Sequence, residues 1–144
     1  MKRFLRVLIA LVLLTAAIGK LVDLPGFTLV LRGYRFFPVP LLWPVAVAIA
    51  GAELLVAFWL LWGRALRRAA QAATSLHLLY AAWSAFMLLR NKPILNCGCF
   101  GSFIARPLSW ATVAENLVLA ALCLALYALC SREGRVLPKY RYEQ

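Results

Sequence analysis

Residues 44–62 read PVAVAIAGAELLVAFWLLW and carry a single charged side chain, Glu53. At about 1.5 Å of rise per residue, a helix of this length spans a hydrocarbon core of roughly 30 Å. Three further apolar stretches have a similar length: Phe4–Leu21, Ala69–Leu89 and Trp110–Cys130. In lipid each segment must satisfy its own backbone polar groups, so we expect all four to be helices. The sequence predicts an all-α membrane protein, a four-helix transmembrane bundle forming one domain over residues 1–144.

The composition agrees with a bilayer environment. The 144 residues are 65% hydrophobic, and the mean hydropathy is +0.84. A soluble domain of this size does not need so much apolar surface. The first stretch follows Lys2, Arg3 and Arg6, which is also typical of a secretory signal. Because the chain begins at Met1, we expect this segment to be retained as a helix.

The net charge of +11 comes from basic residues at the ends of the apolar stretches. This placement favours contact with anionic lipid rather than with nucleic acid. Lys and Arg collect on cytoplasmic loops, which favours both termini in the cytoplasm of a bacterial inner membrane. The inner flanks would carry Lys2, Arg3, Arg6, Arg64, Arg67, Arg68, Arg132, Arg135, Lys139 and Arg141, and the outer flanks Lys20, Arg32, Arg35, Arg90, Lys92 and Arg106.

Two longer connections would then face the periplasm. Residues 22–43 contain Pro25-Gly26 and two further prolines, Pro38 and Pro40, which we expect to break helix, and several aromatic residues suited to the membrane interface. Residues 90–109 lie between the third and fourth helices and contain the sequence Cys97-Gly98-Cys99-Phe100-Gly101. Two thiols one residue apart at a membrane surface favour redox chemistry over a packing role.

Several features suit this pair to thiol–disulfide exchange. The periplasm is the oxidising side, where disulfides persist. Gly98 is the residue best able to accept the backbone angles of a Cys-X-Cys ring, and strained, exposed disulfides are the exchangeable ones. Arg90, Lys92 and Arg106 would stabilise the attacking thiolate. The residues do not decide which cysteine is attacked; we favour Cys99, because Phe100-Gly101 would present it and the following helix N-terminus would favour its thiolate.

Other roles for the cysteines remain open. A static disulfide would stabilise little, because it closes a very short loop. Two thiolates suit soft metal ions, but this loop contains no histidine or third cysteine, so no metal site is assigned. Cys123 and Cys130 lie far along the fourth helix, beyond the reach of a disulfide to the loop. We expect both to be small apolar packing residues.

Ionisable groups within the apolar stretches are candidates for function, because they are costly in a bilayer. They and a neighbouring amide are Lys20, Glu53, His77, Glu115 and Asn116. Lys20 could form a neutralising ion pair with Glu53 or with Glu115. His77 is either a satisfied bundle residue or a proton relay. Together these groups could deliver protons, or bind a quinone headgroup near the cysteines.

The chain resembles the MauE branch of the MauE/DoxX redox-associated membrane proteins. The resemblance rests on Gly19-Lys20, Glu53-Leu54, the Cys97–Gly101 motif, Glu115-Asn116 and the four-helix layout. MauE-type proteins are associated with methylamine utilisation, where they support maturation of a periplasmic disulfide-rich dehydrogenase subunit with a thioredoxin-like partner, MauD. The resemblance implies thiol–disulfide chemistry on a periplasmic client or carrier; it does not imply methylamine as a substrate.

The layout is also similar to the quinone-linked disulfide oxidoreductases of the DsbB and vitamin K epoxide reductase families. Those families relay electrons through a second cysteine pair, which this chain lacks on the outer side. Direct exchange with a soluble partner is therefore favoured. A quinone beneath the cysteine loop, lined by Glu53, His77 and Lys20, is the candidate cofactor.

Three functions follow from these observations. The first is a membrane thiol–disulfide oxidoreductase that acts through Cys97 and Cys99 on a periplasmic thioredoxin-like protein or a disulfide-containing client. The second is a non-catalytic assembly factor that scaffolds a periplasmic enzyme and does not need the dithiol. The third is a soft-metal carrier, which lacks a path of thiols across the membrane.

Overall fold

The computed structural model describes residues 2–91 and 93–136, with side chains to residue 131 in the last helix. It contains five α-helices and a short 3₁₀ helix: α1 (Lys2–Val22), α2 (Leu24–Gly33), η1 (Val39–Leu41), α3 (Leu42–Trp62), α4 (Leu66–Leu89) and α5 (Trp110–Val136). Lys92, Lys139 and Arg141 lie outside the described residues, as do the side chains of Arg132 and Arg135.

The four predicted apolar helices correspond to α1, α3, α4 and α5. Each of them is long and apolar enough to cross a membrane, over Lys2–Val22, Val39–Trp62, Leu66–Leu89 and Trp110–Ser131. The prediction of an all-helical membrane protein with four candidate spans is confirmed. The fourth helix continues past the predicted end at Cys130, to Val136.

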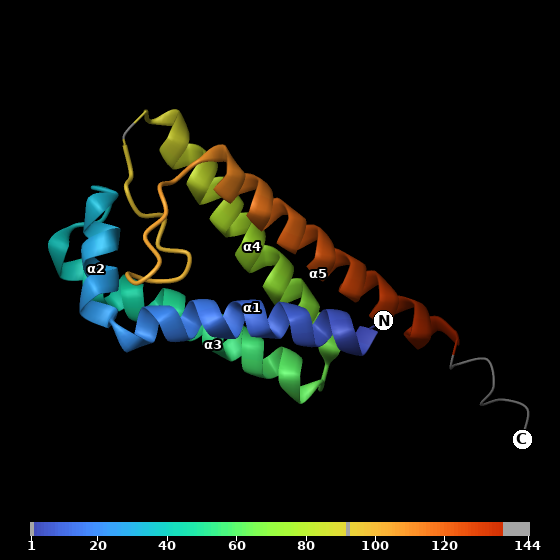
Figure 1. Cartoon of the computed structure of the whole chain (residues 1–144). Coiled ribbons are helices and arrows are strands. Elements are labelled where there is room, and N and C mark those ends of the chain that lie inside the picture. The colour runs from blue at the N-terminus through green and yellow to red at the C-terminus, as the bar shows by residue number, and fades with distance from the viewer. Residues whose placement is uncertain (1, 92, 137–144) are drawn as a thin grey trace, which may run out of the picture.

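The long helices pack as two pairs. α1 lies along α3, and α4 lies along α5 (Figure 1). The pairs diverge toward one end of the molecule, where α2 and the segment 90–109 lie (Figure 1). Nearer the other end, all four helices contribute to a core that includes Leu13, Leu60, Ala70, Cys123 and Leu126. Cys123 is fully buried there and Cys130 packs against the same core, in agreement with the predicted packing role.

Small residues on one stripe of each helix allow α1 and α3 to lie close together. On α3 the buried residues recur every three or four positions: Leu42, Ala46, Ala50, Glu53, Ala57 and Leu60. On α1 the buried stripe ends at Lys20. The charged groups of Lys20 and Glu53 therefore face the interior of the bundle. The opposite face of α3 is apolar and exposed, with Leu55 72% and Trp62 74% accessible, as expected for a surface in contact with lipid.

One prediction about the first long connection is wrong. Pro25-Gly26 does not break helical structure but lies in the first turn of α2. Asp23 is the N-cap of this helix, and its Oδ1 accepts a 2.9 Å hydrogen bond from the backbone N–H of Gly26. Proline is well tolerated at this position, because its missing N–H would have no partner within the helix. α2 buries Phe27, Thr28 and Leu31, and Phe27 and Leu31 pack against α3.

Candidate functional site

The cysteine loop folds back into the space between the helix pairs. Its two legs are joined by backbone hydrogen bonds from Cys97 N–H to Arg106 O at 2.7 Å and from Leu108 N–H to Ile94 O at 3.0 Å. Two side chains of other helices hold the cysteine backbone. Lys20 Nζ of α1 donates to Cys99 O, and Tyr34 Oη, just past α2, donates to Cys97 O, each at 2.7 Å.

Glycines are required where the loop turns and where it meets α1. Gly98 has φ +71°, and a Cβ there would lie 3.0 Å from Val30 Cγ1 and 3.1 Å from Phe27 Cε2. Gly101 has φ +80°, and a Cβ there would clash with the carbonyl of Gly19. A Cβ on Gly19 would lie 2.5 Å from Phe100 O. The left-handed backbone at Gly98 and Gly101 favours glycine, and Gly19 provides the space into which the loop backbone fits.

The two thiols lie side by side in the reduced form. Their Sγ atoms are 2.9 Å apart and share a hydrogen bond, and the backbone N–H of Cys99 donates to Cys97 Sγ at 3.4 Å. These hydrogen bonds, with the nearby Arg106 guanidinium, outweigh burial and lower the pKa of Cys97 to about 6. The hydrogen bond with Cys97, together with burial, raises the pKa of Cys99 well above its usual range. These contacts favour the thiolate at Cys97, whereas the sequence pattern favours Cys99 as the cysteine that is attacked.

The basic residues around the loop have different roles. The Arg106 guanidinium lies close enough to lower the pKa of Cys97, and it also pairs with Glu115 at the start of α5, with Nη1 3.1 Å from Oε1. The Arg90 guanidinium instead lies over the Phe86 ring, 5.8 Å from its centroid. The predicted contribution of Arg90 to the thiolate is therefore not seen, because Arg90 points to an aromatic surface at the end of α4.

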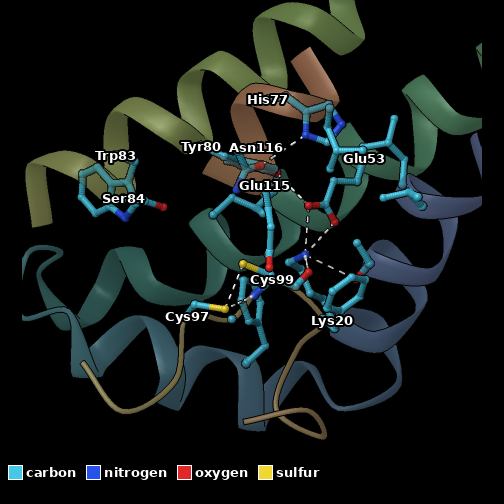
Figure 2. A pocket seen from close by; sticks show the side chains of 18 of the residues that line it. Lys20, Glu53, His77, Tyr80, Trp83, Ser84, Cys97, Cys99, Glu115 and Asn116 are labelled. Carbon is cyan, nitrogen blue, oxygen red and sulfur yellow. Dashed lines mark hydrogen bonds and ion pairs between the residues drawn. The ribbon is translucent and has the colours of Figure 1, made fainter. Parts of the chain in front are cut away.

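A buried polar network lies directly beneath the dithiol. Lys20 Nζ is 2.9 Å from Glu53 Oε1 and from Glu53 Oε2, and Tyr80 Oη donates to Glu53 Oε1 at 2.9 Å. Lys20 is 3% and Glu53 1% exposed. Of the two ion pairs considered for Lys20, the structure contains the one with Glu53. Through Lys20 this network reaches the backbone of Cys99 (Figure 2).

A second polar group joins α4 to α5. His77 Nδ1 and Asn116 Oδ1 are 3.3 Å apart, and Asn116 Nδ2 donates to Thr112 O at 2.9 Å. His77 is 3% exposed, and no group among the described residues lies within hydrogen-bond distance of its Nε2.

A cavity of about 130 Å³ connects these groups. Figure 2 shows side chains from all the long helices converging on it, with the two sulfur atoms at one side and His77 at another. Most of its lining is apolar, from residues such as Val12, Leu13, Ile49 and Leu119. Of the predicted site residues, those that line the cavity are Lys20, Glu53, His77, Cys97, Gly98, Cys99, Phe100, Glu115 and Asn116. Arg90, Gly101 and Arg106 do not line it.

Comparison with known proteins identifies the family of the chain. Residues 1–129 match the family described as methylamine utilisation protein MauE. The chain belongs to the MauE family. It is similar to the methylamine utilization proteins MauE of Paracoccus denitrificans, at 38% identity over 122 residues, and of Paracoccus versutus, at 36% over 125 residues. The MauE of Methylorubrum extorquens is 33% identical over 126 residues. No solved structure matches the chain.

The matches cover 85–88% of this chain and 66–67% of the relatives. The chain therefore spans about two thirds of the length of the MauE proteins it matches, and the resemblance noted in the sequence is confirmed.

Three aromatic residues of this MauE-family site were missed in the sequence: Phe27, Tyr34 and Tyr80. Phe27 packs beneath Gly98, and its ring centroid is 5.6 Å from Lys20 Nζ. Tyr34 and Tyr80 each use a hydroxyl to hold a group of the site. A signal existed for Tyr80, because it lies three positions after His77 in an apolar helix, and a buried tyrosine hydroxyl usually has a partner.

The surroundings of the two thiols concern the alternative role considered above, binding of a soft metal ion. Within residues 2–91 and 93–131, no group of three or more His, Cys, Asp and Glu side chains is placed to hold a metal ion. The dithiol has a guanidinium and an ammonium as its charged neighbours instead.

Proposed function

We propose that this MauE-family chain is a membrane thiol–disulfide oxidoreductase that exchanges disulfides with a thioredoxin-like protein through Cys97 and Cys99. The observation that carries the proposal is the geometry of the pair, in which the two Sγ atoms lie together and Cys97 Sγ also accepts a hydrogen bond from the Cys99 N–H. The sulfur atoms are 2.9 Å apart, and hydrogen bonds and Arg106 favour ionisation of Cys97 while Cys99 keeps its proton. A stabilised thiolate beside a protonated thiol is the arrangement that disulfide exchange requires.

The exchange has two steps. The Cys97 thiolate attacks one sulfur of the partner disulfide, so that a Cys97–partner disulfide forms and the partner's second sulfur leaves as a thiolate. Cys99 then transfers its proton to that thiolate and attacks Cys97 Sγ, which releases the partner's first sulfur as a thiolate that takes a proton from water. One disulfide forms between Cys97 and Cys99 and one is broken in the partner, and the reverse sequence reduces the Cys97–Cys99 disulfide.

The surroundings of the pair support this chemistry. The bonds from Tyr34 and Lys20 hold the cysteine carbonyls and leave both sulfur atoms free to react. Gly98 gives the short ring its left-handed backbone. The relatives are named for methylamine utilisation, so we propose a protein of such a system as the client, with the thioredoxin-like protein as the intermediate carrier.

We further propose that residues 1–144 form a single membrane domain with both termini in the cytoplasm and the cysteine loop in the periplasm. The support is the sequence, which has more Lys and Arg residues in the segments 2–6, 64–68 and 132–141 than in the segments that flank the loop side. The pair would then face the compartment in which disulfides persist.

Trapping of the mixed disulfide tests the proposed function. The Cys99→Ser variant keeps the attacking thiolate but cannot resolve the intermediate, so it should accumulate a disulfide-linked complex with a thioredoxin-like protein, detected on non-reducing gels. The matched control is Cys123→Ala, which removes a buried thiol far from the loop and should accumulate nothing. Client maturation that survives alanine at both Cys97 and Cys99 would instead support the assembly-factor function.

Side-selective labelling tests the topology. A membrane-impermeant maleimide applied to spheroplasts should label Cys97 and Cys99 only after reduction, as read by mass spectrometry. Labelling only in inverted vesicles would place the loop in the cytoplasm and overturn the proposed topology. Labelling without reduction, blocked by a thiophilic metal ion, would favour the metal carrier.

A further inference from the structure

The cysteine loop brings a different cation to each of its two cysteines. Cys97 lies on the leg that pairs with Arg106, whose carbonyl accepts a 2.7 Å hydrogen bond from the Cys97 N–H. The Arg106 side chain is 43% exposed. Cys99 follows the left-handed turn at Gly98, and Lys20 Nζ donates to its carbonyl at 2.7 Å. Lys20 is buried. An exposed cation therefore adjoins Cys97, and a buried cation adjoins Cys99.

The last turn of α1 determines where the buried cation lies. A Cβ on Gly19 would lie 2.5 Å from Phe100 O, so the chain after Cys99 rests directly on this turn. On the same turn, the Lys20 ammonium bonds both the Cys99 carbonyl and the Glu53 carboxylate, whose two oxygens are each 2.9 Å away (Figure 2). The positive end of the buried ion pair thus faces the loop.

The environment of this ammonium increases its electrostatic effect. Lys20 is almost fully buried, and the Phe27 ring, whose centroid is 5.6 Å from Nζ, packs against Gly98 of the loop. Charges interact more strongly in an apolar interior than in water, and salt screens them less. We therefore expect Lys20 to act on Cys99 more strongly than a comparable surface charge would.

The charged and titratable groups around Cys99 come from the loop and from all four long helices. They are Cys97 and Arg106 in the loop, Lys20 on α1, Glu53 on α3, Tyr80 and His77 on α4, and Glu115 on α5. The hydrogen bond with Cys97, burial and the charge of Cys97 raise the pKa of Cys99, whereas Lys20 and then Arg106 lower it. For Cys97 the cation that lowers the pKa is Arg106.

The negative charge of the pair moves during the proposed exchange. In the reduced pair the contacts favour a thiolate at Cys97. Cys97 becomes neutral once it has formed the mixed disulfide with the partner. The resolving attack then needs a thiolate at Cys99, which is half-buried. An ionised group in such a place is costly unless a charge of opposite sign lies beside it.

We propose that Lys20 stabilises the Cys99 thiolate in the resolving step, that Glu53 holds the ammonium in position, and that Arg106 acts on Cys97 in the first attack. This assignment rests on the proposed function, because it concerns a step of that exchange. In the step, the Cys99 thiolate attacks Cys97 Sγ and the bond from Cys97 to the partner breaks. The electron pair of that bond leaves on the partner's first sulfur, which takes a proton from water. Lys20 keeps its proton throughout.

Alkylation of Cys99 in a Cys97→Ala protein tests the proposal. Alanine is uncharged at this position, as Cys97 is in the mixed disulfide. The double variant Lys20→Met/Glu53→Leu removes the ammonium without leaving a carboxylate buried and unpaired. Loss of a neighbouring opposite charge raises a thiol pKa by about one unit or more. At a fixed pH below the midpoint, the iodoacetamide rate at Cys99, read by mass spectrometry, should therefore fall about tenfold.

The direction of the change separates an effect of charge from a loosened loop. A loop that only loses a hydrogen bond exposes its thiol to water, which lowers the pKa of the thiol and speeds alkylation. Tyr34→Phe gives this comparison, because it removes the bond to the carbonyl of residue 97 and changes no charge. Tyr34→Phe should therefore speed alkylation of Cys99, whereas removal of the Lys20 charge should slow it.

A second neutral pair and a distant cation complete the set. Lys20→Gln/Glu53→Gln keeps polar groups in the interior, so it also serves if the Met/Leu pair does not fold, and it should slow alkylation of Cys99 as well. Arg67→Gln removes a cation near the start of α4, where Arg67 bonds Tyr127, and should leave the rate unchanged. An unchanged or faster rate in the neutral pairs would overturn the proposal.

Single-turnover kinetics assign the effect to one step. Dithiodipyridine is a neutral disulfide that releases one thiopyridone when Cys97 attacks and a second when Cys99 resolves. Lys20→Met/Glu53→Leu should slow the second release about tenfold and affect the first much less. Arg106→Gln should slow mainly the first. Release by Cys97→Ser/Cys99→Ser protein, from the remaining thiols, is subtracted. A slowed first release with an unchanged second would show that Lys20 acts on the attack and would overturn the proposal.

The two proposals fail separately, because neither Lys20 measurement uses a partner protein. A protein that traps a thioredoxin-like partner but keeps its Cys99 reactivity in the neutral pairs retains the exchange function and excludes the role of Lys20. A protein whose Cys99 depends on Lys20 but which traps no partner retains that role in the dithiol and excludes exchange with a thioredoxin-like protein.

Discussion

Lys20 Nζ lies 2.9 Å from both carboxylate oxygens of Glu53, and the same ammonium lies 2.7 Å from the carbonyl of Cys99. A buried ion pair that joins α1 to α3 thus also supports the backbone of the cysteine loop. Burying both charges is costly, and their mutual attraction with the added hydrogen bonds offsets this cost. Such a pair is sensitive to the loss of either partner.

Replacement of Lys20 by Met should strongly destabilise the protein. The substitution leaves the Glu53 carboxylate buried with only Tyr80 as a partner, a change that costs roughly 3–5 kcal/mol. The double variant Lys20→Met/Glu53→Leu should recover much of this loss, because no uncompensated charge remains. Unfolding in detergent, followed by circular dichroism, measures both effects. The comparison is Arg106→Gln in the half-exposed pair with Glu115, which should cost no more than about 1 kcal/mol.

Gly19→Ala should displace the cysteine loop without disturbing α1 itself. The new Cβ would lie 2.5 Å from Phe100 O, a backbone atom that can retreat only if the loop moves. We expect loss of mixed-disulfide formation in the Cys99→Ser background, with helix content unchanged. Gly51→Ala on α3 is the matched control, since its Cβ would have no neighbour within 4 Å. Unimpaired exchange in Gly19→Ala would show that close docking of the loop is not required.

Alkylation of Cys97 should depend on pH in a characteristic way. The thiolate is the reactive form, and its fraction rises as the pH increases through the pKa, which the Cys99 hydrogen bond and Arg106 lower to about 6. The iodoacetamide rate should therefore rise between about pH 5 and 7 and then level off, while Cys99 stays unreactive. Cys99→Ala removes the hydrogen bond that lowers the Cys97 pKa most, so the midpoint of the alkylation rate should move to higher pH. A midpoint near pH 9 in the native protein would contradict the assigned thiolate.

Tyr34→Phe should loosen the loop while leaving its sequence intact. The variant removes the hydrogen bond to Cys97 O, which is worth about 1 kcal/mol, so amide exchange in the loop should accelerate about fivefold. Hydrogen–deuterium exchange read by mass spectrometry over residues 94–106 gives the measurement. Tyr127→Phe, which affects a bond to Arg67 near the start of α4, should leave the loop unchanged. Equal protection of the loop in native and Tyr34→Phe protein would show that this bond contributes nothing.

The spans could be predicted because hydropathy depends on local sequence alone. The runs around Ile49 and Leu119 identify their helices without knowledge of any neighbour. α2 was missed for the opposite reason, because Pro25 was taken to end helical structure, although a capping residue, Asp23, precedes it. Whether a proline ends a helix or begins one depends on its position relative to the N-cap residue.

Partner choice within the site was less predictable. Glu53 and Glu115 were both candidates for Lys20, and the sequence contains nothing that ranks them. The choice depends on the pairing of α1 with α3 and on the rotation of each helix, which three-dimensional packing determines. The environment of Cys97 depends on contacts across the loop, first the hydrogen bond with the Cys99 thiol and then the Cys99 N–H and the guanidinium of Arg106.

The two bonds that hold the cysteine loop both end on backbone carbonyls, Tyr34 on that of Cys97 and Lys20 on that of Cys99. Neither bond involves a sulfur atom, so neither has to break when the thiols are oxidised. The sulfur atoms, already 2.9 Å apart, need to approach by less than an ångström to reach a disulfide length of about 2.05 Å. We therefore expect the scaffold to stay in place when the pair is oxidised, with little movement of the backbone. On the proposed function, we expect the loop to be oxidised and reduced repeatedly without rearrangement of the fold.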